Sequence, residues 1–369
     1  MLLSRVRLVG IGPFDDVTFA FGEENGRPRL ANVILGGACA GKTSLLAATA
    51  STRPGHAVAQ LVGRSESGVP GHAIADYTLG DDDPARPHPL RVVSPNAKLE
   101  DEEDGGLARR REQTLFDRRA AEGGFTCVAI SGARWFSRTP MALTSPDRTI
   151  FRYDPRAAAS FDDASRADLA RETKQAIVMA AIGSALAAHG TPDHAERSDD
   201  EGPRSRTVST PAHAQRLALC QASMIAALGA ILDGTGFAYD GVDPFRLEPV
   251  FSERGGSQHL FDDLPRGVRH GIAFAALPLR ALWGAYPGAD ARDAEAVVLI
   301  DDAEAQLPAA QQRTLVPRLR RALPRVQWIL TTASPAIAEG AEVGDVIAVR
   351  RLPGESRVEL FDGASAILH

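Results

Sequence analysis

A strand, a glycine-rich loop and a helix follow one another near the N-terminus, and they constrain the fold more than any other feature. Residues 36–43 read Gly-Gly-Ala-Cys-Ala-Gly-Lys-Thr, which fits the pattern G-x-x-x-x-G-K-[ST]. The apolar residues 32–35 run straight into the glycines, and residues 42–50 have the composition of a helix. Backbone N–H groups in such a loop, together with the positive end of the helix dipole, suit phosphate. The sequence therefore predicts a P-loop.

The positions of this loop have expected tasks. Lys42 is placed to reach the β- and γ-phosphates of a nucleotide, and the Thr43 hydroxyl is placed to ligate Mg²⁺. Cys39 is interpreted as a small loop residue rather than as a redox switch. The residues predicted to bind the nucleotide here are Gly36, Gly37, Ala38, Cys39, Ala40, Gly41, Lys42, Thr43 and Ser44.

A second segment, far along the chain, supplies a candidate carboxylate. Residues 296–300 form a continuous apolar run, as in a parallel strand buried on both faces, and Asp301 follows at the carboxyl end. Taken alone, Asp301 is most simply a turn residue. The next buried strand, 326–331, comes after a helix that begins near Pro308, which predicts a parallel βαβ unit. In that setting Asp301 is predicted to be the second protein ligand of Mg²⁺.

Other segments predict further strands and an α-helical lobe. Residues 2–9 and 17–21 alternate apolar and polar side chains, as half-buried strands do. Two long helices are expected at 163–189 and 210–233. Further strand-like segments lie at 73–79, 90–93 and 125–130.

The expected fold class is α/β. It has a P-loop NTPase core with a mainly parallel sheet, an N-terminal antiparallel β region and an inserted α-helical lobe. The chain is expected to divide into a first half of the core at 1–62, an insert with the β accessory region and α lobe at 63–245, and a second half of the core at 246–369.

Composition narrows the class of protein. The net charge of −6 argues against a generally basic surface for nucleic acid. The local arginine clusters, at 109–111, 118–119 and 318–325, are interpreted as solvated helical faces, with contact to phosphate as the alternative. Three scattered cysteines suit neither a zinc site nor a disulfide framework. No apolar run approaches the roughly 18–20 residues that span a membrane. We expect a cytoplasmic protein with no membrane partner.

The order of these blocks resembles the ABC-type ATPase heads of the RecF, SMC and OLD group of P-loop proteins. The resemblance covers about residues 1–60 and 245–352, and it rests on the P-loop and three later segments. In that group the last two segments usually read D-E-x-E-x-H-L and T-H-S-P. The segments here are Leu-Pro-Arg-Gly-Val-Arg at 264–269, Leu-Ile-Asp-Asp-Ala-Glu-Ala-Gln-Leu at 299–307, and Thr-Thr-Ala-Ser-Pro at 331–335.

The resemblance implies an engine that works as a dimer or higher oligomer on ATP and Mg²⁺. In such heads the nucleotide on one P-loop is closed over by the signature segment of the other subunit. Gly267 stands where the signature glycine is expected, at the start of a helix expected at 268–279. The signature serine is replaced by Pro265 or Arg266, depending on the alignment. Arg266 is a candidate for a charge-assisted bond to the partner's nucleotide, and the alternative is an arginine on the dimer surface.

Two positions linked to hydrolysis also depart from the family pattern. Asp302 stands where the catalytic glutamate is expected, and its side chain is one methylene shorter, which predicts slow activation of water. Ala333 replaces the switch histidine and cannot hydrogen-bond a γ-phosphate. Glu304 either shares the positioning of water with Asp302 or caps the following helix. A glutamine that contacts Mg²⁺ is expected as well, and Gln60 and Gln113 both qualify.

The expected function is an ATP-binding, dimerising ATPase of slow turnover. It acts with nucleic acid or inside a DNA-repair or phage-defence complex, with a nuclease or another effector as a partner. The alternative is a non-hydrolysing, ATP-gated scaffold that regulates a partner effector. A GTPase or small-molecule kinase is disfavoured, because no N-K-x-D segment follows a late strand.

Overall fold

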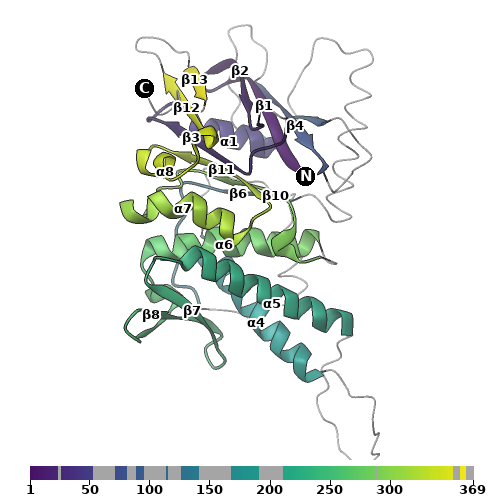
Figure 1. The fold of residues 1–369 in the computed structure, drawn as a ribbon, viewed down its shortest axis with the longest axis vertical. Helices are drawn as coiled ribbons and strands as arrows, with labels where there is room; N and C mark the ends of the chain where they lie inside the picture. Colours follow the sequence, from purple (N-terminus) through teal and green to yellow (C-terminus); the bar gives the residue numbers. More distant parts are fainter. Residues whose placement is uncertain are drawn as a thin grey trace, which may run out of the picture.

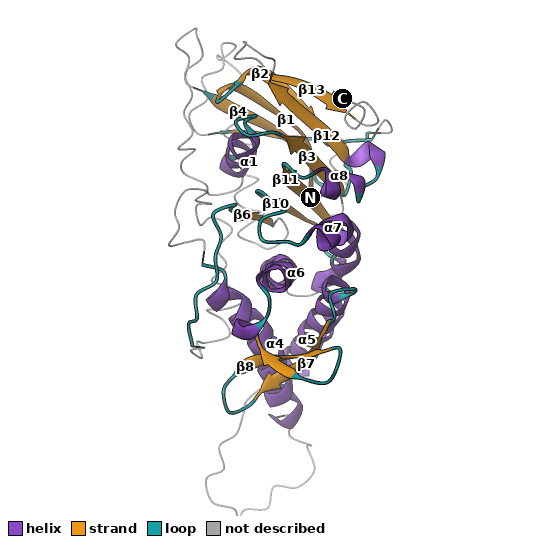
Figure 2. Ribbon diagram, turned by 90° about the vertical axis from the view of Figure 1, so that its left-hand side faces the viewer, coloured by secondary structure: helices purple, strands orange, loops and turns teal. Residues whose placement is uncertain are grey.

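The chain folds into stacked layers of sheet and helix (Figures 1 and 2). An antiparallel sheet lies at one end, a mainly parallel sheet follows, and helices form the other end of the molecule. This computed structural model describes residues 1–23, 26–52, 71–80, 89–94, 114, 126–140, 168–190, 211–286, 289–351 and 358–362.

The antiparallel sheet has the strand order β2-β1-β4-β5. Its first hairpin joins β1 (Leu2–Ile11) to β2 (Phe14–Ala20), and β1 also pairs with β4 (His72–Thr78), which in turn pairs with β5 (Leu90–Val93). The alternating segments therefore form antiparallel strands, as predicted. The strands at 72–78 and 90–93 extend the sheet that the first two strands begin.

The second sheet has the order β13-β12-β3-β11-β10-β6, and only its edge strand β13 is antiparallel to its neighbour. Strand β10 is apolar throughout and all five of its residues are buried, because helices or the other sheet cover both faces. This confirms the predicted α/β class. The strands are β3 (Ala31–Gly36), β6 (Cys127–Ile130), β10 (Ala296–Ile300), β11 (Val326–Thr332), β12 (Val346–Arg351) and β13 (Val358–Asp362).

Strand order brings distant parts of the sequence to one edge of this sheet. β11 lies between β3 and β10, and all three are parallel, so their carboxyl ends meet at the same edge. Helix α1 (Lys42–Ser51) follows β3 and contacts both sheets. The helices α7 (Ala309–Ala322) and α8 (Pro335–Glu339) follow β10 and β11.

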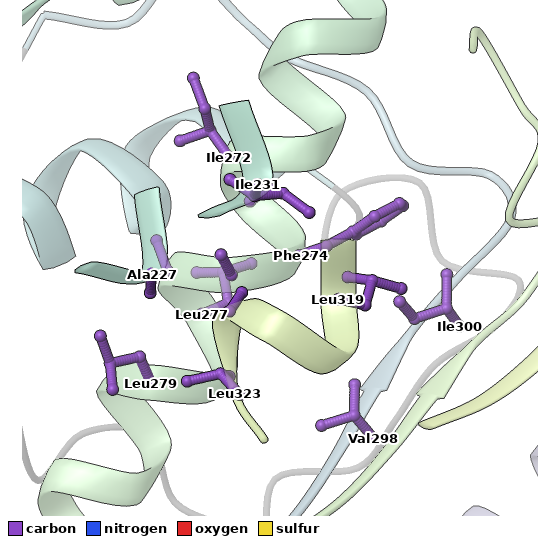
Figure 3. Close-up of a cluster of buried hydrophobic side chains, with 14 of the residues drawn as sticks. Ala227, Ile231, Ile272, Phe274, Leu277, Leu279, Val298, Ile300, Leu319 and Leu323 are labelled. Carbon is purple, nitrogen blue, oxygen red and sulfur yellow. The ribbon is translucent and has the colours of Figure 1, made fainter. Parts of the chain in front are cut away.

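The α-helical layers pack on this sheet through α6 (Arg266–Ala285). Beyond α6 lie α4 (Ala170–Gly190) and α5 (Pro211–Leu232), both of which contact it. One hydrophobic cluster runs from β10 through α7 and α6 to α5, and Figure 3 shows part of it. A small antiparallel sheet, β7 (Phe237–Asp243), β8 (Glu248–Glu253) and β9 (Gln258–Leu260), lies beside α4 and α5.

One stretch of α5, Ala214–Leu232, is long and apolar enough to cross a membrane by length and composition alone. The sequence reasoning expected no such stretch. In the structure one side of this helix belongs to the core, since Met224, Leu228 and Ile231 are almost fully buried. Core helices of this kind meet the same criterion, so the stretch is weak evidence for a membrane span.

The arginine cluster at 318–325 is engaged with the protein itself. Arg318 is buried and donates to the carbonyl oxygen of Ile231 at 2.9 Å, so it is not part of a solvated face. Its three neighbours pair with carboxylates: Arg320 with Glu342, Arg321 with Asp233, and Arg325 with Glu295. The clusters at 109–111 and 118–119 lie outside the described residues.

A buried carboxyl group before β12 predicts how stability depends on pH. Burial raises the pKa of Asp345 to about 6, Glu342 and Glu23 reinforce the rise, and Arg320 and Arg29 oppose it. A carboxyl whose folded pKa is raised stabilises the fold at low pH, and this contribution is lost as the pH rises through about 6. Asp345→Asn should therefore stabilise the protein at pH 8 by about 1–3 kcal/mol.

Urea unfolding of both proteins at pH 4 and pH 8 measures this effect. The gain should shrink to a small fraction of its pH 8 value at pH 4, because Asp345 is then protonated in the folded chain and nearly half protonated in the unfolded chain. Asp233→Asn is the control, because Asp233 is 60% exposed in its pair with Arg321. An Asp345→Asn protein that is less stable than the wild type at pH 8 would contradict the prediction.

Candidate nucleotide-binding site

Two glycines of the 36–43 loop are required by close packing. Gly41 ends the loop with φ +85°, and a Cβ there would lie 2.6 Å from Pro13 Cγ and 2.7 Å from the Phe14 ring. A Cβ on Gly36 would lie 2.8 Å from the carbonyl oxygen of Val349. The turn between β1 and β2 and the strand β12 thus fix the two ends of the loop. Only glycine fits both places without a shift of the backbone.

The middle of the loop faces outward. Gly37, Ala38 and Cys39 are exposed, whereas Ala40 is buried. Cys39 has φ +61° and carries a free thiol. Ser44, in the first turn of α1, lies beside Gly12. The exposed segment therefore leaves room above the loop for a ligand, as the P-loop prediction requires.

Lys42 places a positive charge under this loop. It is 9% exposed, and its Nζ donates to the carbonyl oxygens of Gly36 at 2.8 Å and Gly37 at 2.9 Å. An ammonium has three donors, so one remains for an anion above the loop. The helix α1 begins at Lys42, and its unpaired N–H groups add to the positive potential there.

The two predicted Mg²⁺ ligands lie in direct contact. Thr43 Oγ1 donates to Asp301 Oδ2 at 2.9 Å, although 258 positions separate these residues in the sequence. The other carboxylate oxygen, Asp301 Oδ1, accepts from Thr331 Oγ1 at 2.6 Å. Asp301 is 3% exposed, and Thr331 is fully buried. Thr331 orients this carboxylate; the sequence reasoning placed Thr331 in a late motif but gave it no role.

These oxygens suit Mg²⁺, which prefers hydroxyl, carboxylate and phosphate oxygens and keeps few protein ligands. Among the residues that the structure describes, no group of three or more His, Cys, Asp and Glu side chains could hold a metal ion. Magnesium would therefore be held by Thr43, Asp301 and the phosphates of a nucleotide. Lys42 and the loop N–H groups would hold those phosphates, so the residues fit Mg–ATP.

Asp302 follows in a turn with an unusual backbone. Its φ is +44°, a left-handed conformation that costs most residues energy but that aspartate tolerates. The turn is held because the Asp302 amide donates to Thr331 Oγ1 at 2.9 Å. Burial raises the pKa of the Asp302 carboxyl, and the nearby Asp301 and Glu304 raise it further. Lys42 and Arg134 lower this pKa, so Asp302 lies among two other carboxyl groups and two cations.

Glu304 does not cap the following helix, which was one of its two expected roles. Its Oε1 accepts from the backbone amide of Ala333 at 2.8 Å, whereas the following helix α7 begins after Pro308. The contact joins residues 301–306, the acidic turn, to the segment before α8. Glu304 is therefore a link between the 301–306 turn and the end of β11, and its other oxygen is buried without a hydrogen bond.

A segment that the sequence reasoning missed closes over the acidic turn. It follows β6 and includes Gly132 and Arg134. A Cβ on Gly132 would lie 3.0 Å from Asp302 Oδ2 and 3.2 Å from Asp301 Oδ2. Arg134 donates to the carbonyl oxygens of both aspartates. The signal available in the sequence was its place directly after the predicted strand 125–130, since the carboxyl ends of parallel strands carry functional groups.

The candidate signature residues lie at the start of α6. Pro265 caps this helix, which begins at Arg266 and is longer at both ends than the expected 268–279. Arg266 is exposed and donates weakly to Gln306 Oε1 at 3.5 Å. Gly267 is buried, and a Cβ there would lie 3.0 Å from Gln306 O and from Pro308 Cδ. Arg266 and Gly267 therefore both contact the 306–311 segment of the same chain.

A cavity of about 400 Å³ opens beside the P-loop at the carboxyl ends of β3, β11 and β12. Ala333 lines it, so the position of the expected switch histidine offers no hydrogen-bonding side chain. The lining residues include Gly36, Gly37, Ala333, Glu339 and Arg350. The candidate glutamines Gln60 and Gln113 lie outside the described residues.

Comparison with known proteins gives a fold. No protein-family model matches this chain, and no curated protein matches its sequence. It is similar to a solved Smc head bound to the C-terminal winged-helix domain of ScpA, with 13% identity, a TM-score of 0.50 and coverage of 98% of both chains. A Pyrococcus furiosus Smc head with an extended coiled coil, bound to the C-terminal domain of ScpA, gives the same identity and TM-score over 98% of this chain and 96% of that one.

The SMC head domain of Thermotoga maritima is also similar, with 11% identity and a TM-score of 0.48 over 98% of this chain and 99% of that one. At 13% identity, the two Smc heads with the higher TM-score establish the fold of this chain and nothing further. The chain has the fold of an SMC head, which is an ABC-type P-loop ATPase fold.

Proposed function

We propose that this protein binds ATP with Mg²⁺ and hydrolyses it slowly, as an ABC-type ATPase of the RecF- and OLD-like kind. The observation that carries the proposal is the 2.9 Å contact between Thr43 Oγ1 and Asp301 Oδ2 beside an exposed glycine loop. A hydroxyl and a carboxylate from the two ends of the chain meet there, and these two groups would hold Mg²⁺. In this proposal residues 1–62 and 246–369 are the halves of the ATPase core, and 63–245 is the insert.

The residues of the site have distinct tasks in this reaction. The N–H groups of residues 36–44 and Nζ of Lys42 bind the phosphates, and Thr43 and Asp301 hold Mg²⁺. Magnesium supplies charge neutralisation on the phosphate oxygens. Asp302 accepts the proton of the attacking water, a role that its raised pKa favours because a base with a very low pKa accepts protons poorly.

Slow turnover follows from the length of one side chain. A general base acts within about 2.6–3.2 Å of the proton that it takes. Aspartate at position 302 is one methylene shorter than the usual glutamate, and Ala333 adds no second polar group. Both changes remove contacts to the attacking water or to the γ-phosphate, while the groups that bind phosphate are kept.

The proposal includes dimerisation around the nucleotide. Arg266 is exposed at the positive end of the 20-residue helix α6, so a phosphate held by a second copy would meet a guanidinium and a helix N-terminus together. Homodimers or higher oligomers formed in this way would act in the cytoplasm, in DNA repair or phage defence, with nucleic acid or with a nuclease or other effector. The Smc heads solved with ScpA are a structural precedent for a protein partner.

The second candidate function is an ATP-gated scaffold that does not hydrolyse. The observation that favours it is the contact of Glu304 with the Ala333 amide, because this contact takes up the carboxylate that is closest to the switch position. ATP-dependent dimers with turnover at background level would identify the scaffold. Dimers that dissociate as ATP is consumed would identify the ATPase.

Removal of one side chain tests the proposed site. Lys42→Ala should weaken ATP binding by about 30-fold or more, because the loss of a partly buried charge-assisted contact to phosphate costs about 2 kcal/mol or more. Turnover should fall to background in the same variant. Calorimetric titration with ATP and a phosphate-release assay measure the two effects.

The control for this test is Arg320→Ala, which removes an equal charge from an exposed pair with Glu342. It should leave the affinity for ATP unchanged, since exposed pairs contribute little. If the wild-type protein does not bind Mg–ATP, the proposed function is wrong. Equal ATP affinity in the wild type and Lys42→Ala would place the nucleotide elsewhere.

A further inference from the structure

Arg134 is a buried arginine whose donors point at backbone rather than at carboxylates. It is 6% exposed. Its Nη1 donates to the carbonyl oxygen of Asp301 at 2.5 Å and to that of Ser131 at 3.1 Å, and its Nη2 donates to the carbonyl oxygen of Asp302 at 2.8 Å. The planar guanidinium therefore hydrogen-bonds to two consecutive peptide groups of the acidic turn.

These two carbonyl groups flank a strained residue. Asp302 holds φ at +44°, and the carbonyl oxygens of Asp301 and Asp302 lie on either side of that torsion. A rigid guanidinium that donates to both carbonyl oxygens fixes their relative orientation. With Arg134 in place, the Asp302 side chain leaves the turn in one direction. Without it, the turn can relax to a negative φ and carry the carboxylate away.

Burial of this guanidinium carries an energetic cost that the site offsets. Burial lowers the pKa of Arg134 to about 10, whereas the charges of Asp301, Asp302 and Glu304 act in the opposite direction. The side chain is therefore still charged at neutral pH. Its Nε has no hydrogen-bond partner among the described residues. The buried charge of Arg134 is thus stabilised by the carboxylates of the acidic turn.

Arg134 also contacts the helix that carries the candidate signature. Its Cζ lies 5.0 Å from the centre of the Phe274 ring of α6, a cation–π contact. The neighbouring Phe136 packs edge-on against His270 of α6, with the two ring centres 4.9 Å apart. Cζ of Arg269, also in α6, lies 5.3 Å from the centre of the Phe136 ring. The segment 134–136 thus lies between the acidic turn and the first turns of α6, which begins at Arg266.

We propose that Arg134 is a positioning residue for Asp301 and Asp302, and that it ties their turn to α6. This inference rests on the proposed function, since it assigns to the acidic turn a role with Mg²⁺ and water. Arg134 touches neither the nucleotide nor the reacting atoms in this assignment. It sets the direction of the two carboxylates, and Phe274 of α6 contacts the guanidinium.

The chain offers a matched control for this idea. Arg318 is 3% exposed and also donates to backbone carbonyl oxygens, namely those of Ile231, Gln311 and Thr314. It joins α7 to α5 and makes no hydrogen bond to the acidic turn. Arg134→Lys and Arg318→Lys both keep the charge and both lose the planar fork. A merely structural role predicts similar losses in the two variants.

Hydrogen exchange and Mg²⁺-dependent ATP binding tell the two roles apart. In Arg134→Lys the amides of Asp302 and Ala303, which donate to Thr331, should exchange about tenfold faster or more, because the turn opens locally. The gain in ATP affinity on adding Mg²⁺ should fall about 10- to 100-fold, with affinity in EDTA nearly unchanged. Arg318→Lys should show neither effect. Phe274→Leu, which keeps the guanidinium and removes the ring, should give smaller losses of the same kind.

The outcomes separate this inference from the proposed function. Equal exchange rates and equal Mg²⁺ gains in Arg134→Lys and Arg318→Lys would overturn the positioning role while ATP binding by the wild type stands. Absence of ATP binding by the wild type would overturn the proposed function, and the exchange of the Asp302 amide alone would then decide whether Arg134 holds the turn. Where Arg134→Lys does not fold, the Phe274→Leu variant decides by the same two measurements.

Discussion

Asp302→Glu should raise the ATP turnover of this protein by about tenfold or more. The added methylene moves the carboxylate out by roughly 1.5 Å, and a general base works only within about 2.6–3.2 Å of the proton it takes. The backbone contacts of this turn should confine the effect of Asp302→Glu to the length of the side chain. The Asp302 amide is held by Thr331 Oγ1, and the carbonyl oxygens beside it are held by Arg134, so the turn itself keeps its place.

Steady-state phosphate release measures this effect, with ATP affinity as the companion value. The affinity should change little, because Asp302 is not among the groups that bind phosphate. Asp302→Asn is the matched control, since amide for carboxylate keeps the size and removes the base. It should reduce turnover to background. If Asp302→Glu leaves an active wild-type rate unchanged, Asp302 is not the base.

The Asp302→Glu result also separates the two candidate functions. If the wild type binds ATP without measurable turnover and the glutamate variant hydrolyses it, the short side chain alone accounts for the loss. If both bind ATP, form dimers and fail to hydrolyse it, the scaffold is the better account. In the active case, Lys42→Ala combined with Asp302→Glu should abolish turnover again.

Gly41→Ala should cost both stability and nucleotide binding. A Cβ at position 41 would lie 2.6 Å from Pro13 Cγ and 2.7 Å from Phe14, which is fully buried, and φ at +85° is unfavourable for alanine. The two effects add to about 2–4 kcal/mol of unfolding free energy. Relief of the clash would displace the start of α1, which carries Lys42 and Thr43, so ATP affinity should fall about tenfold or more.

Gly37→Ala is the control in the same loop. A Cβ on Gly37 meets nothing within 4 Å, and its φ is not in the left-handed region. This variant should unfold within about 0.5–1 kcal/mol of the wild type, as is usual for exposed substitutions. Urea unfolding and ATP titration of the two variants check the comparison. Equal stabilities for Gly41→Ala and Gly37→Ala would show that the turn at Gly12–Phe14 does not hold the end of the loop.

Local patterns were enough to predict the elements that form the candidate site. The run from 296 to 300 is apolar throughout because β10 is covered on both faces, so its strand and the turn at Asp301 were readable. The loop at 36–43 and the start of α1 could be predicted for a similar reason. The flexible glycines, the lysine and a helix-forming segment are adjacent in the sequence. The order of the strands followed from the βαβ rule only in part, because it does not say that β11 lies between β3 and β10.

The roles of Thr331, Gly132 and Arg134 were not readable. Each depends on a contact between segments that are far apart: Thr331 with Asp301, Gly132 with both aspartates, and Arg134 with two carbonyl oxygens and Phe274. No local pattern marks a backbone carbonyl as an acceptor for a buried arginine. Glu304 is a similar case, since the amide that it accepts from belongs to a segment 29 residues later.

The sequence by itself determined that this chain has a P-loop, a buried strand that ends in two aspartates, and a short side chain where a longer base is expected. Glycine spacing, apolar runs and side-chain length are local properties, and they do not depend on tertiary contacts. Only the tertiary structure decided that Thr43 meets Asp301, that Glu304 holds the Ala333 amide, and that Arg134 fixes the acidic turn. These are pairings of hydrogen-bond donors and acceptors across a sheet edge, and strand order, which no local pattern encodes, determines which of them meet.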